Sequence, residues 1–348
     1  MPVTLTDLAT LSAWDTIIDV RSPAEYAEDH LPGAINLPVL SDVERAHVGT
    51  IFKQDSPFTA RKIGAALVAR NAARHIEDSL MQHGGGWQPL VYCWRGGQRS
   101  GSFTSILQQI GWRADIVAGG YQSYRRMVSG RLYDQPLGLR IVRLDGYTGT
   151  AKTDLLARAA LRGVQVIDLE GLAHHRGSIL GDMDGPQPAQ KGFESALLAQ
   201  IMQFDPTRPV LVEAESSRIG RLRLPPGLWG AMQDSPRIVI AAPVPARAAY
   251  LAAAYADMAA DATALAARLD GLRALAGHAT VDGWLDLMRA GQMVDLAQAL
   301  VLQHYDPAYA RARKAQGGAV LETLKTETLD ADALNRLADG IVEALRSG

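Results

Sequence analysis

Short apolar runs alternate with longer amphipathic segments in the first part of the chain. Residues 16–20 (TIIDV), 89–93 (PLVYC) and 114–120 (ADIVAGG) contain β-branched residues and lead into turn residues, which predicts three strands. Residues 100–111 (SGSFTSILQQIG) have apolar side chains at helical spacing and end in glycine, which predicts a helix. This order of strand, loop, helix and strand is typical of a parallel α/β sheet.

A second α/β pattern begins near residue 139. A helix is predicted at 151–163, where Gly163 ends the apolar periodicity. After about residue 246 the pattern is helical to the end of the chain, and the polar segment 129–138 is the predicted joint. The further runs that predict strands are 139–146 (LRIVRLDG), 164–169 (VQVIDL), 209–215 (PVLVEAE) and 236–244 (PRIVIAAPV). We therefore expect α/β domains at 1–130 and 131–245, followed by a helical region at 246–348.

Composition places the chain among ordinary globular proteins. Its 348 residues suffice for two or three domains, and 47% hydrophobic with 21% charged residues is typical of a soluble protein. The single cysteine cannot form an internal disulfide, so nothing requires an oxidising compartment. The chain shows no signal-peptide pattern at its start and no apolar run of membrane length, so we expect a cytoplasmic protein with no membrane partner. A net charge of −2 means that a nucleic-acid partner would need a local basic patch.

The single cysteine, Cys93, occupies an activating position. It ends a predicted strand and precedes Arg95, Gly96, Gly97 and Arg99, just before a predicted helix. Loop amides and a helix N-terminus stabilise an anion, and the two arginines add positive charge. These features favour the nucleophilic thiolate. The alternative is a small buried core thiol, and glycines and arginines are poor neighbours for one.

The segment Gly146–Thr153 (GYTGTAKT) predicts a phosphate-binding loop. It follows a strand, opens a helix and fits G-x-x-x-x-G-K-[ST], except that Ala151 replaces the second glycine. In this pattern backbone amides surround phosphate oxygens, the lysine supplies charge, and the hydroxyl binds Mg²⁺. The alternative is a glycine-rich turn with Lys152 exposed to solvent. The residues predicted to bind a diphosphate are Gly146, Gly149, Lys152 and Thr153.

Two polar clusters follow this loop. In Asp168–Gly181 (DLEGLAHHRGSILG), the adjacent histidines lack metal-ligand spacing, so no metal site is predicted there. Asp168 and Arg176 are candidates for substrate contact, and a solvated loop remains the alternative. Glu213 and Glu215 end a predicted strand near the phosphate-binding loop, where carboxylates can hold Mg²⁺ directly or through water.

Three arginines, Arg218, Arg221 and Arg223, follow this strand. Their spacing gives a local concentration of positive charge in a chain whose net charge is slightly negative. They are candidates for contact with a nucleic-acid backbone, because phosphate contacts supply most of the non-specific affinity. A solvated charged turn is the alternative.

Part of the chain resembles rhodanese domains. The resemblance lies in Ile17–Pro38 (IIDVRSPAEYAEDHLPGAINLP) and Val117–Arg125 (VAGGYQSYR), and it places Cys93 on the persulfide-carrying nucleophile of that family. The loop from Cys93 to Arg99 is one residue longer than the usual sulfurtransferase loop and has the length found in dual-specificity phosphatases. A wider loop suits a larger tetrahedral anion, so the resemblance implies a phosphate-like donor.

The whole chain resembles the tRNA 2-selenouridine synthase family, a rhodanese-like domain followed by a P-loop domain. The segments that match are CWRGGQRS, GYTGTAKT, DLEGLAHHRGS, KGFES and VEAESSRIGRLRLP. The resemblance implies replacement of sulfur by selenium in the wobble 2-thiouridine of tRNA. It also implies selenophosphate as the donor and an S-geranyl intermediate made from geranyl diphosphate.

The same resemblance implies a division of roles. Cys93 with Arg95, Gly96, Gly97 and Arg99 would receive selenophosphate, and the phosphate-binding loop would hold the diphosphate of geranyl diphosphate or of a nucleotide. One rival is a sulfurtransferase or phosphatase-like domain fused to an NTP-dependent kinase, without an RNA substrate. Another rival is a non-catalytic tRNA-binding protein, which the arginines around Cys93 disfavour.

Overall fold

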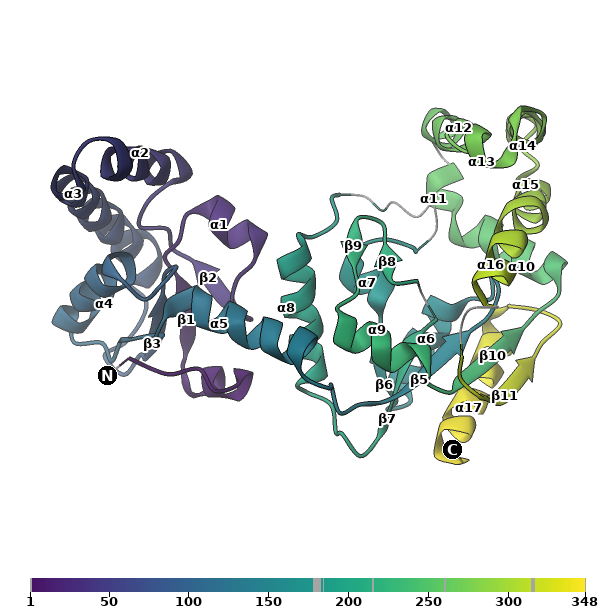
Figure 1. Ribbon diagram of the computed structural model, residues 1–348, viewed down its shortest axis with the longest axis horizontal. Helices are drawn as coiled ribbons and strands as arrows, with labels where there is room; N and C mark the ends of the chain where they lie inside the picture. Colours follow the sequence, from purple (N-terminus) through teal and green to yellow (C-terminus); the bar gives the residue numbers. More distant parts are fainter. Residues whose placement is uncertain are drawn as a thin grey trace. The chain divides into compact units, whose positions relative to one another are not determined.

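The computed structural model describes residues 2–347 except 178–182, 184, 215, 260 and 314–316 (Figure 1). The chain forms two compact units. Unit 1 consists of Met1–Gln135 and Pro188–Gln203, and unit 2 consists of Pro136–Gln187 and Phe204–Gly348. Each unit has its own parallel sheet, which confirms the predicted α/β class.

In the described part of unit 1, a four-stranded sheet has the order β2-β1-β3-β4, and all neighbours are parallel. Its central strand β3 is buried along its whole length, as expected when helices cover both faces of a parallel sheet. The strands are β1 (Thr16–Asp19), β2 (Ala34–Asn36), β3 (Pro89–Tyr92) and β4 (Asp115–Ile116). The helices are η1 (Leu8–Ala13), α1 (Pro23–Glu28), α2 (Asp42–Gln54), α3 (Pro57–His75), η2 (Ile76–Leu80), α4 (Gln98–Ile110), α5 (Gly120–Ser129), η3 (Gly130–Asp134) and α8 (Gln190–Ile201).

The predicted helix after Cys93 is α4. It ends at Gly111, whose φ of +111° is accessible to glycine at little cost, and this explains the residue at that position. Phe103 and Leu107 on its inner face are fully buried against β3. The predicted joint at 129–138 is helical in its first half, because η3 continues α5 to Asp134, and the boundary between the units follows Gln135.

Helix α8 belongs to unit 1, although the chain enters and leaves it from unit 2. It packs against α5 and η3. The Glu194 side chain is 1% exposed and accepts hydrogen bonds from Arg125 and from the Tyr133 hydroxyl, the latter at 2.6 Å. A carboxylate buried this deeply needs such partners, so this ion pair is part of how α8 is held.

Replacing Glu194 by alanine is expected to destabilise unit 1 by about 3 kcal/mol. The change leaves the largely buried Arg125 charge without its carboxylate, and breaking a pair of this kind is costly. Urea denaturation of the full chain measures the effect. The matched control is Lys191→Ala on the same helix, because the Lys191–Glu28 pair is 37% and 48% exposed and contributes at most about 1 kcal/mol. Equal stability of the two variants would contradict the prediction.

In the described part of unit 2, a five-stranded parallel sheet has the order β11-β10-β5-β7-β6. Its strands are β5 (Arg140–Asp145), β6 (Gln165–Ile167), β7 (Pro209–Glu213), β10 (Arg237–Ala241) and β11 (Val320–Lys325). β8 (Arg218–Ile219) and β9 (Leu222–Arg223) form a separate antiparallel hairpin. The expectation of helix throughout 246–348 is wrong at β11. This edge strand is largely exposed, so it lacks the apolar alternation by which a strand is recognised.

Helices surround the sheet of unit 2. Helix α17 is amphipathic and buries Leu334, Leu337 and Ile341 in the same core as Leu155 of α6. A second core, which includes the fully buried Trp284, lies among the helices between β10 and β11. The helices are α6 (Lys152–Leu161), α7 (Leu169–Ala173), α9 (Pro226–Gln233), α10 (Val244–Ala254), α11 (Ala256–Ala259), α12 (Ala262–Asp270), α13 (Arg273–Ala276), α14 (His278–Arg289), α15 (Met293–Leu300), η4 (Val301–Tyr305), α16 (Asp306–Arg313) and α17 (Ala331–Ser347). Among the described residues, no helix has both the length and the hydropathy that a transmembrane segment requires.

Candidate active sites

Cys93 lies directly after β3 and is 4% exposed. Its Sγ is 3.1 Å from the hydroxyl oxygen of Ser100 in the first turn of α4. Burial raises the pKa of the thiol, but hydrogen bonds from the Ser100 hydroxyl and from the amides of Ser100 and Arg95 act in the opposite direction, together with the Arg99 charge. The net result is a lowered pKa, so the thiolate is favoured as the sequence predicts.

The backbone of the loop after Cys93 is held by the segment that follows β4. The amides of Tyr121 and Gln122 donate to the carbonyl oxygens of Cys93 and Trp94 at 2.8 and 3.0 Å. Gly120 has a φ of +57°, and a Cβ there would collide with the Cys93 carbonyl oxygen. Gly96 has a φ of +69°, and a Cβ there would lie 2.9 Å from the Val117 carbonyl oxygen, so glycine at this position lets the loop turn tightly. Gly97 directly precedes the first residue of α4.

The two arginines of this loop have different partners. Nε of Arg95 donates to the Gln122 side chain at 3.1 Å, and this contact is exposed. Arg99 forms an ion pair with Glu25 at 2.7 Å. Burial raises the pKa of Glu25, but the hydrogen bond and the charge of Arg99 lower it by more. The net shift of the Glu25 pKa is therefore downward. Sequence reasoning did not identify Glu25 as this partner, because the two residues lie 74 positions apart.

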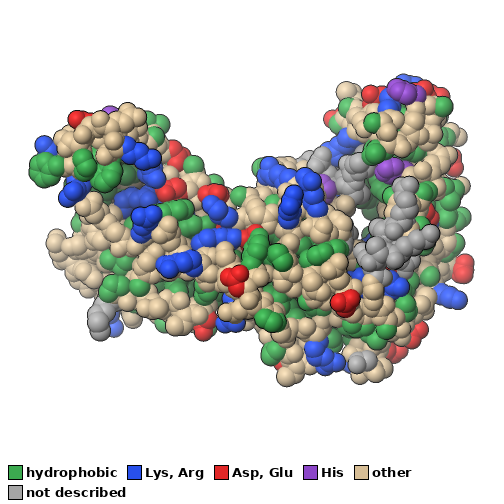
Figure 2. Space-filling view, in the orientation of Figure 1, with side chains coloured by type: hydrophobic (Ala, Val, Ile, Leu, Met, Phe, Trp, Pro, Cys, Tyr) green, Lys and Arg blue, Asp and Glu red, His purple; other side chains and the backbone are tan. Residues whose placement is uncertain are grey.

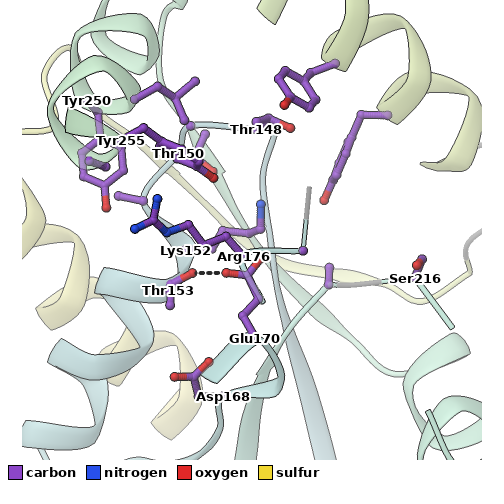
Figure 3. Close-up of a pocket in the computed structure, with 18 of the residues that line it drawn as sticks. Thr148, Thr150, Lys152, Thr153, Asp168, Glu170, Arg176, Ser216, Tyr250 and Tyr255 are labelled. Atoms are coloured by element: carbon purple, nitrogen blue, oxygen red, sulfur yellow. Dashed lines mark hydrogen bonds between the residues drawn. The ribbon is translucent and has the colours of Figure 1, made fainter. Parts of the chain in front are cut away.

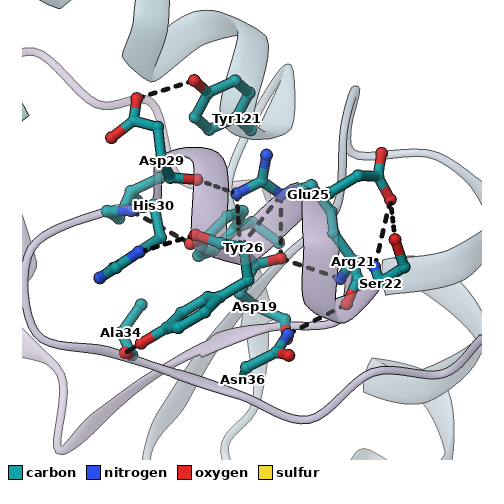
Figure 4. Close-up of polar contacts among 12 residues, drawn as sticks. Asp19, Arg21, Ser22, Glu25, Tyr26, Asp29, His30, Ala34, Asn36 and Tyr121 are labelled. Carbon is teal, nitrogen blue, oxygen red and sulfur yellow. Dashed lines mark hydrogen bonds and ion pairs between the residues drawn. The ribbon is translucent and has the colours of Figure 1, made fainter. Parts of the chain in front are cut away.

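A buried ion pair between Arg21 and Asp19 supports the Cys93 loop. The Arg21 guanidinium donates to Asp19 at 2.6 Å and to the Asp29 carbonyl oxygen at 2.6 Å (Figure 4). It also lies 4.0 Å from the ring centre of Tyr121, whose hydroxyl donates to the Asp29 carboxylate at 2.7 Å. Because the Tyr121 amide binds the Cys93 carbonyl, this network fixes the loop and gives a physical reason for Asp19 and Arg21 in the rhodanese-like pattern.

Replacing Ser100 by alanine is expected to raise the pKa of Cys93. The change removes the hydroxyl hydrogen bond and leaves the opposing effect of burial in place. The pH dependence of alkylation by a small reagent measures it, and the midpoint should move to higher pH. Arg95→Ala is the control, because the Arg95 contribution to the thiol comes from its backbone amide. An unchanged midpoint in Ser100→Ala would contradict the prediction.

The phosphate-binding loop joins β5 to α6 in unit 2. Nζ of Lys152 donates to the Gly146 carbonyl oxygen at 3.1 Å, and Gly149 has a φ of +86°. Ala151 also adopts the left-handed region, with a φ of +58°, at the position where the P-loop pattern has glycine. This conformation costs an L-residue about 1–2 kcal/mol. The loop therefore keeps its turn despite the substitution, at the expense of stability.

A cavity of about 600 Å³ opens beside this loop (Figure 3). The Thr153 hydroxyl donates to Glu170 at 2.8 Å, and the Glu170 amide donates to Glu213 at 2.8 Å. Asp168 lines the cavity and accepts a hydrogen bond from the Gly171 amide, so it caps α7. The Arg176 guanidinium lies 4.8 Å from the ring centre of Tyr255 on the cavity wall. The structure thus brings together four of the predicted residues in one cavity: Lys152, Thr153, Asp168 and Arg176. Glu213 is linked to this cavity through its hydrogen bond with the Glu170 amide. Glu215 lies outside the described residues.

The helical region contributes side chains that sequence reasoning missed. Arg247 on α10 is 3% exposed, donates to the Thr148 carbonyl oxygen at 3.1 Å and pairs with Asp306 at 2.7 Å. Nζ of Lys152 lies 5.6 Å from the ring centre of Tyr309, whose hydroxyl donates to Asp145 at 3.2 Å. No local motif marks these residues, because they meet the loop only after the helices have packed on the sheet.

The adjacent histidines have structural contacts. His174 ends α7 with a φ of +50°, and His175 is buried and accepts a hydrogen bond from the Gly177 amide at 3.1 Å. Within the described ranges, no three His, Cys, Asp or Glu side chains are grouped as metal ligands. The Thr153 hydroxyl and the Glu170 carboxylate both face the cavity. They are the oxygen groups best placed to serve as ligands of Mg²⁺.

The three candidate arginines lie on the β8–β9 hairpin, and their side chains are exposed. Lys and Arg side chains gather on the face formed by this hairpin (Figure 2). The Arg221 guanidinium and amide both donate to Gln187, and Nε of Arg218 donates to the Gly220 carbonyl oxygen at 2.9 Å. The hairpin thus presents a basic surface, which this weakly acidic chain would need to bind nucleic acid.

Comparisons with known proteins match both parts of the chain. A family model described as "tRNA 2-selenouridine synthase AAA domain" matches residues 139–282, and a model of the rhodanese-like domain matches residues 4–127. Curated relatives named tRNA 2-selenouridine synthase include proteins of Nitrosomonas europaea, 34% identical over 69% of this chain, and Alcanivorax borkumensis, 37% identical over 67%. The chain spans 64% and 65% of the length of these two relatives.

A third relative of that name, from Aeromonas salmonicida, is 36% identical over 73% of this chain and 68% of its own length. The matched regions contain both the thiol loop with Cys93 and the phosphate-binding loop with Lys152. On this sequence similarity and on the pair of sites, the chain belongs to the tRNA 2-selenouridine synthase family.

Proposed function

We propose that this protein replaces sulfur by selenium in the wobble 2-thiouridine of tRNA, in the cytoplasm, through an S-geranyl intermediate. The observation that supports this best is the presence of two chemically different sites in one chain. One is a buried thiol of lowered pKa at the start of a loop that carries Arg95 and Arg99, and the other is a P-loop beside a cavity of about 600 Å³. The names of the relatives supply the selenium and tRNA chemistry.

The P-loop site performs the alkylation. The thiocarbonyl sulfur attacks C1 of geranyl diphosphate, the C1–O bond breaks, and inorganic diphosphate leaves with the electron pair while the uridine N3 proton passes to solvent. Lys152 and the loop amides stabilise the charge on the departing diphosphate. Alkylation prepares the nucleoside for substitution at C2. The thiocarbonyl sulfur is a poor leaving group, whereas the alkylated sulfur can leave as a thiol.

The Cys93 site delivers selenium. The thiolate attacks the phosphorus of selenophosphate, the P–Se bond breaks, and hydrogen selenide leaves. Selenide attacks C2 of the S-geranyl nucleoside, the C2–S bond breaks, and geranyl thiol leaves with the selenide proton while N3 regains a proton from solvent. Water then hydrolyses the phosphocysteine to phosphate. Amides at the N-terminus of α4 favour an anion beside Cys93.

Mg²⁺ fits the P-loop site chemically. Thr153 and Glu170 present a hydroxyl and a carboxylate to the cavity, and hard oxygen ligands of this kind are the ones that Mg²⁺ prefers. When bound, the ion would partly neutralise the diphosphate. Breaking the hydrogen bond between the Thr153 hydroxyl and Glu170 would make both groups available as ligands.

The decisive test incubates the protein with thiolated tRNA and geranyl diphosphate, with and without selenophosphate. Mass spectrometry of the wobble nucleoside is expected to show the S-geranyl form without selenophosphate and 2-selenouridine with it. The rival function, an NTP-dependent kinase joined to a sulfurtransferase or phosphatase-like domain, predicts nucleotide turnover without tRNA. An unmodified nucleoside in both reactions, with ATP hydrolysis in the absence of tRNA, would favour that rival.

Changing Arg218, Arg221 and Arg223 together to glutamine is expected to flatten the salt dependence of tRNA binding. Each phosphate contact contributes about 0.7–0.9 to the slope of log affinity against log salt, so the loss of three contacts should reduce the slope by about 2–3. Filter binding over a salt series measures it. Arg289→Gln is the control, because Arg289 is 65% exposed and lies on α14, outside the hairpin. An unchanged slope in the triple variant would place the RNA contact elsewhere.

A further inference from the structure

A second cavity adjoins the phosphate pocket in unit 2. Its volume is about 70 Å³, and it shares Thr148, Leu251, Tyr255 and Tyr305 with the larger cavity described above. The two cavities therefore lie next to each other along these four side chains. None of the proposed chemical steps uses this space.

The second cavity is lined by helices of the region between β10 and β11. Helices α10, α12 and α15 supply most of its wall, including Leu265, Met293 and Leu300. Figure 1 labels these three helices. No Asp, Glu, Lys, Arg or His is among the described residues that line it. Such a lining binds hydrocarbon well, because moving apolar surface out of water is favourable. It binds charged groups poorly, because a charge buried without partners loses its hydration.

The two neighbouring cavities thus differ sharply in polarity. Lys152 and Arg176 lie in the larger one, and the Arg247 guanidinium binds the Thr148 carbonyl oxygen on its edge. From the P-loop to α15 the lining changes from charged to apolar, since Lys152, Arg176, Asp168 and Glu170 all line the larger cavity. This gradient matches a ligand with an anionic head and a hydrocarbon tail. The ribose of a nucleotide would find no hydrogen-bonding side chain in the deep part except those of Thr148 and the two tyrosines on the shared wall.

We propose that this second cavity binds the far end of a prenyl chain whose diphosphate is held by the P-loop, an inference that rests on the proposed geranyl transfer. The size agrees with one isoprene unit. A water-sized group needs about 10–15 Å³ of such space, so a cavity of about 70 Å³ holds roughly five to seven groups, enough for the five carbons of one isoprene unit. The first isoprene unit of geranyl diphosphate then lies across the shared wall, beside Leu251, Tyr255 and Tyr305.

Ala252 offers a way to fill the cavity without disturbing the charged site. Its side chain on α10 lines the second cavity and is half-buried, whereas that of its neighbour Ala253 is exposed and does not line it. Ala252→Leu and Ala253→Leu therefore add the same atoms to the same helix at two different places. Leu296→Ala has the opposite effect, because it removes a side chain from the cavity wall and lengthens the space.

The test measures the affinity of the full chain for inorganic diphosphate, dimethylallyl diphosphate, geranyl diphosphate, farnesyl diphosphate and ATP by calorimetry. The unaltered protein should bind geranyl diphosphate about 10²–10³-fold more tightly than dimethylallyl diphosphate, because it buries about five more carbons. Ala252→Leu should lose most of this preference and bind inorganic diphosphate normally, and Ala253→Leu should keep it. Leu296→Ala should bind farnesyl diphosphate more tightly than the unaltered protein does.

The outcomes separate the two proposals. If the unaltered protein prefers geranyl diphosphate and Ala252→Leu keeps that preference, the prenyl chain lies elsewhere and only the assignment of this cavity fails. If the unaltered protein binds geranyl diphosphate no more tightly than inorganic diphosphate, or binds ATP more tightly than either, the proposed geranyl transfer fails as well. Should Ala252→Leu prove unfolded by thermal melting, an unchanged response of Leu296→Ala to farnesyl diphosphate would still overturn the inference.

Discussion

Replacing Cys93 by alanine should abolish selenium incorporation, with a loss on the order of 10³-fold or more, as expected when a catalytic nucleophile is removed. The thiol has a lowered pKa and accepts hydrogen bonds from the first turn of α4, so its chemistry depends on the sulfur atom itself. The S-geranyl form of tRNA should then accumulate, because the P-loop site retains its residues. Mass spectrometry of the wobble nucleoside measures both products.

The fold of this variant is expected to survive. Cys93 is buried, but its replacement by alanine removes a single heavy atom from the core. A thermal melt close to that of the unaltered protein provides the control. Normal selenation by folded Cys93→Ala would mean that the thiol is a core residue, the alternative that its surroundings in the sequence disfavour.

Replacing Lys152 by alanine should reduce geranylation of thiolated tRNA by about 10²–10³-fold, the usual effect of removing one donor to a developing anion. Lys152 opens α6, and its Nζ faces the cavity beside the Gly146 carbonyl oxygen. The rate of S-geranyl formation with saturating tRNA measures the loss. Lys325→Ala is the matched control, because this exposed lysine on the edge strand β11 belongs to the same unit.

The same variant also tests the division of roles. Selenation of tRNA that has already been geranylated should be normal in Lys152→Ala, because Cys93 and its supporting network lie in unit 1. Cys93→Ala should show the reverse pattern. If Lys152→Ala blocks both reactions equally while binding tRNA normally, the two steps share one site or the P-loop binds a nucleotide.

The sequence alone determined the local features of both sites. At each site a strand, a glycine-containing loop and the start of a helix follow one another directly in the sequence. The order Cys93, Gly96, Gly97 and α4 was therefore predictable, and so was Lys152 at the start of α6. The parallel sheets followed for the same reason, since apolar runs of strand length alternate with helical periodicity. The lowered pKa of Cys93 also follows from neighbours within seven residues.

Other features depended on contacts between distant segments, which leave no local pattern. Glu25 meets Arg99, and α8 joins unit 1 through Glu194, only when the chain has folded. β11 is a strand because β10 offers it hydrogen bonds, although its own residues are largely exposed. The apolar cavity beside the P-loop exists for the same reason. Leucines and methionines at helical spacing predict only a core face, and whether that face is filled or left hollow is decided by how α10, α12 and α15 pack together.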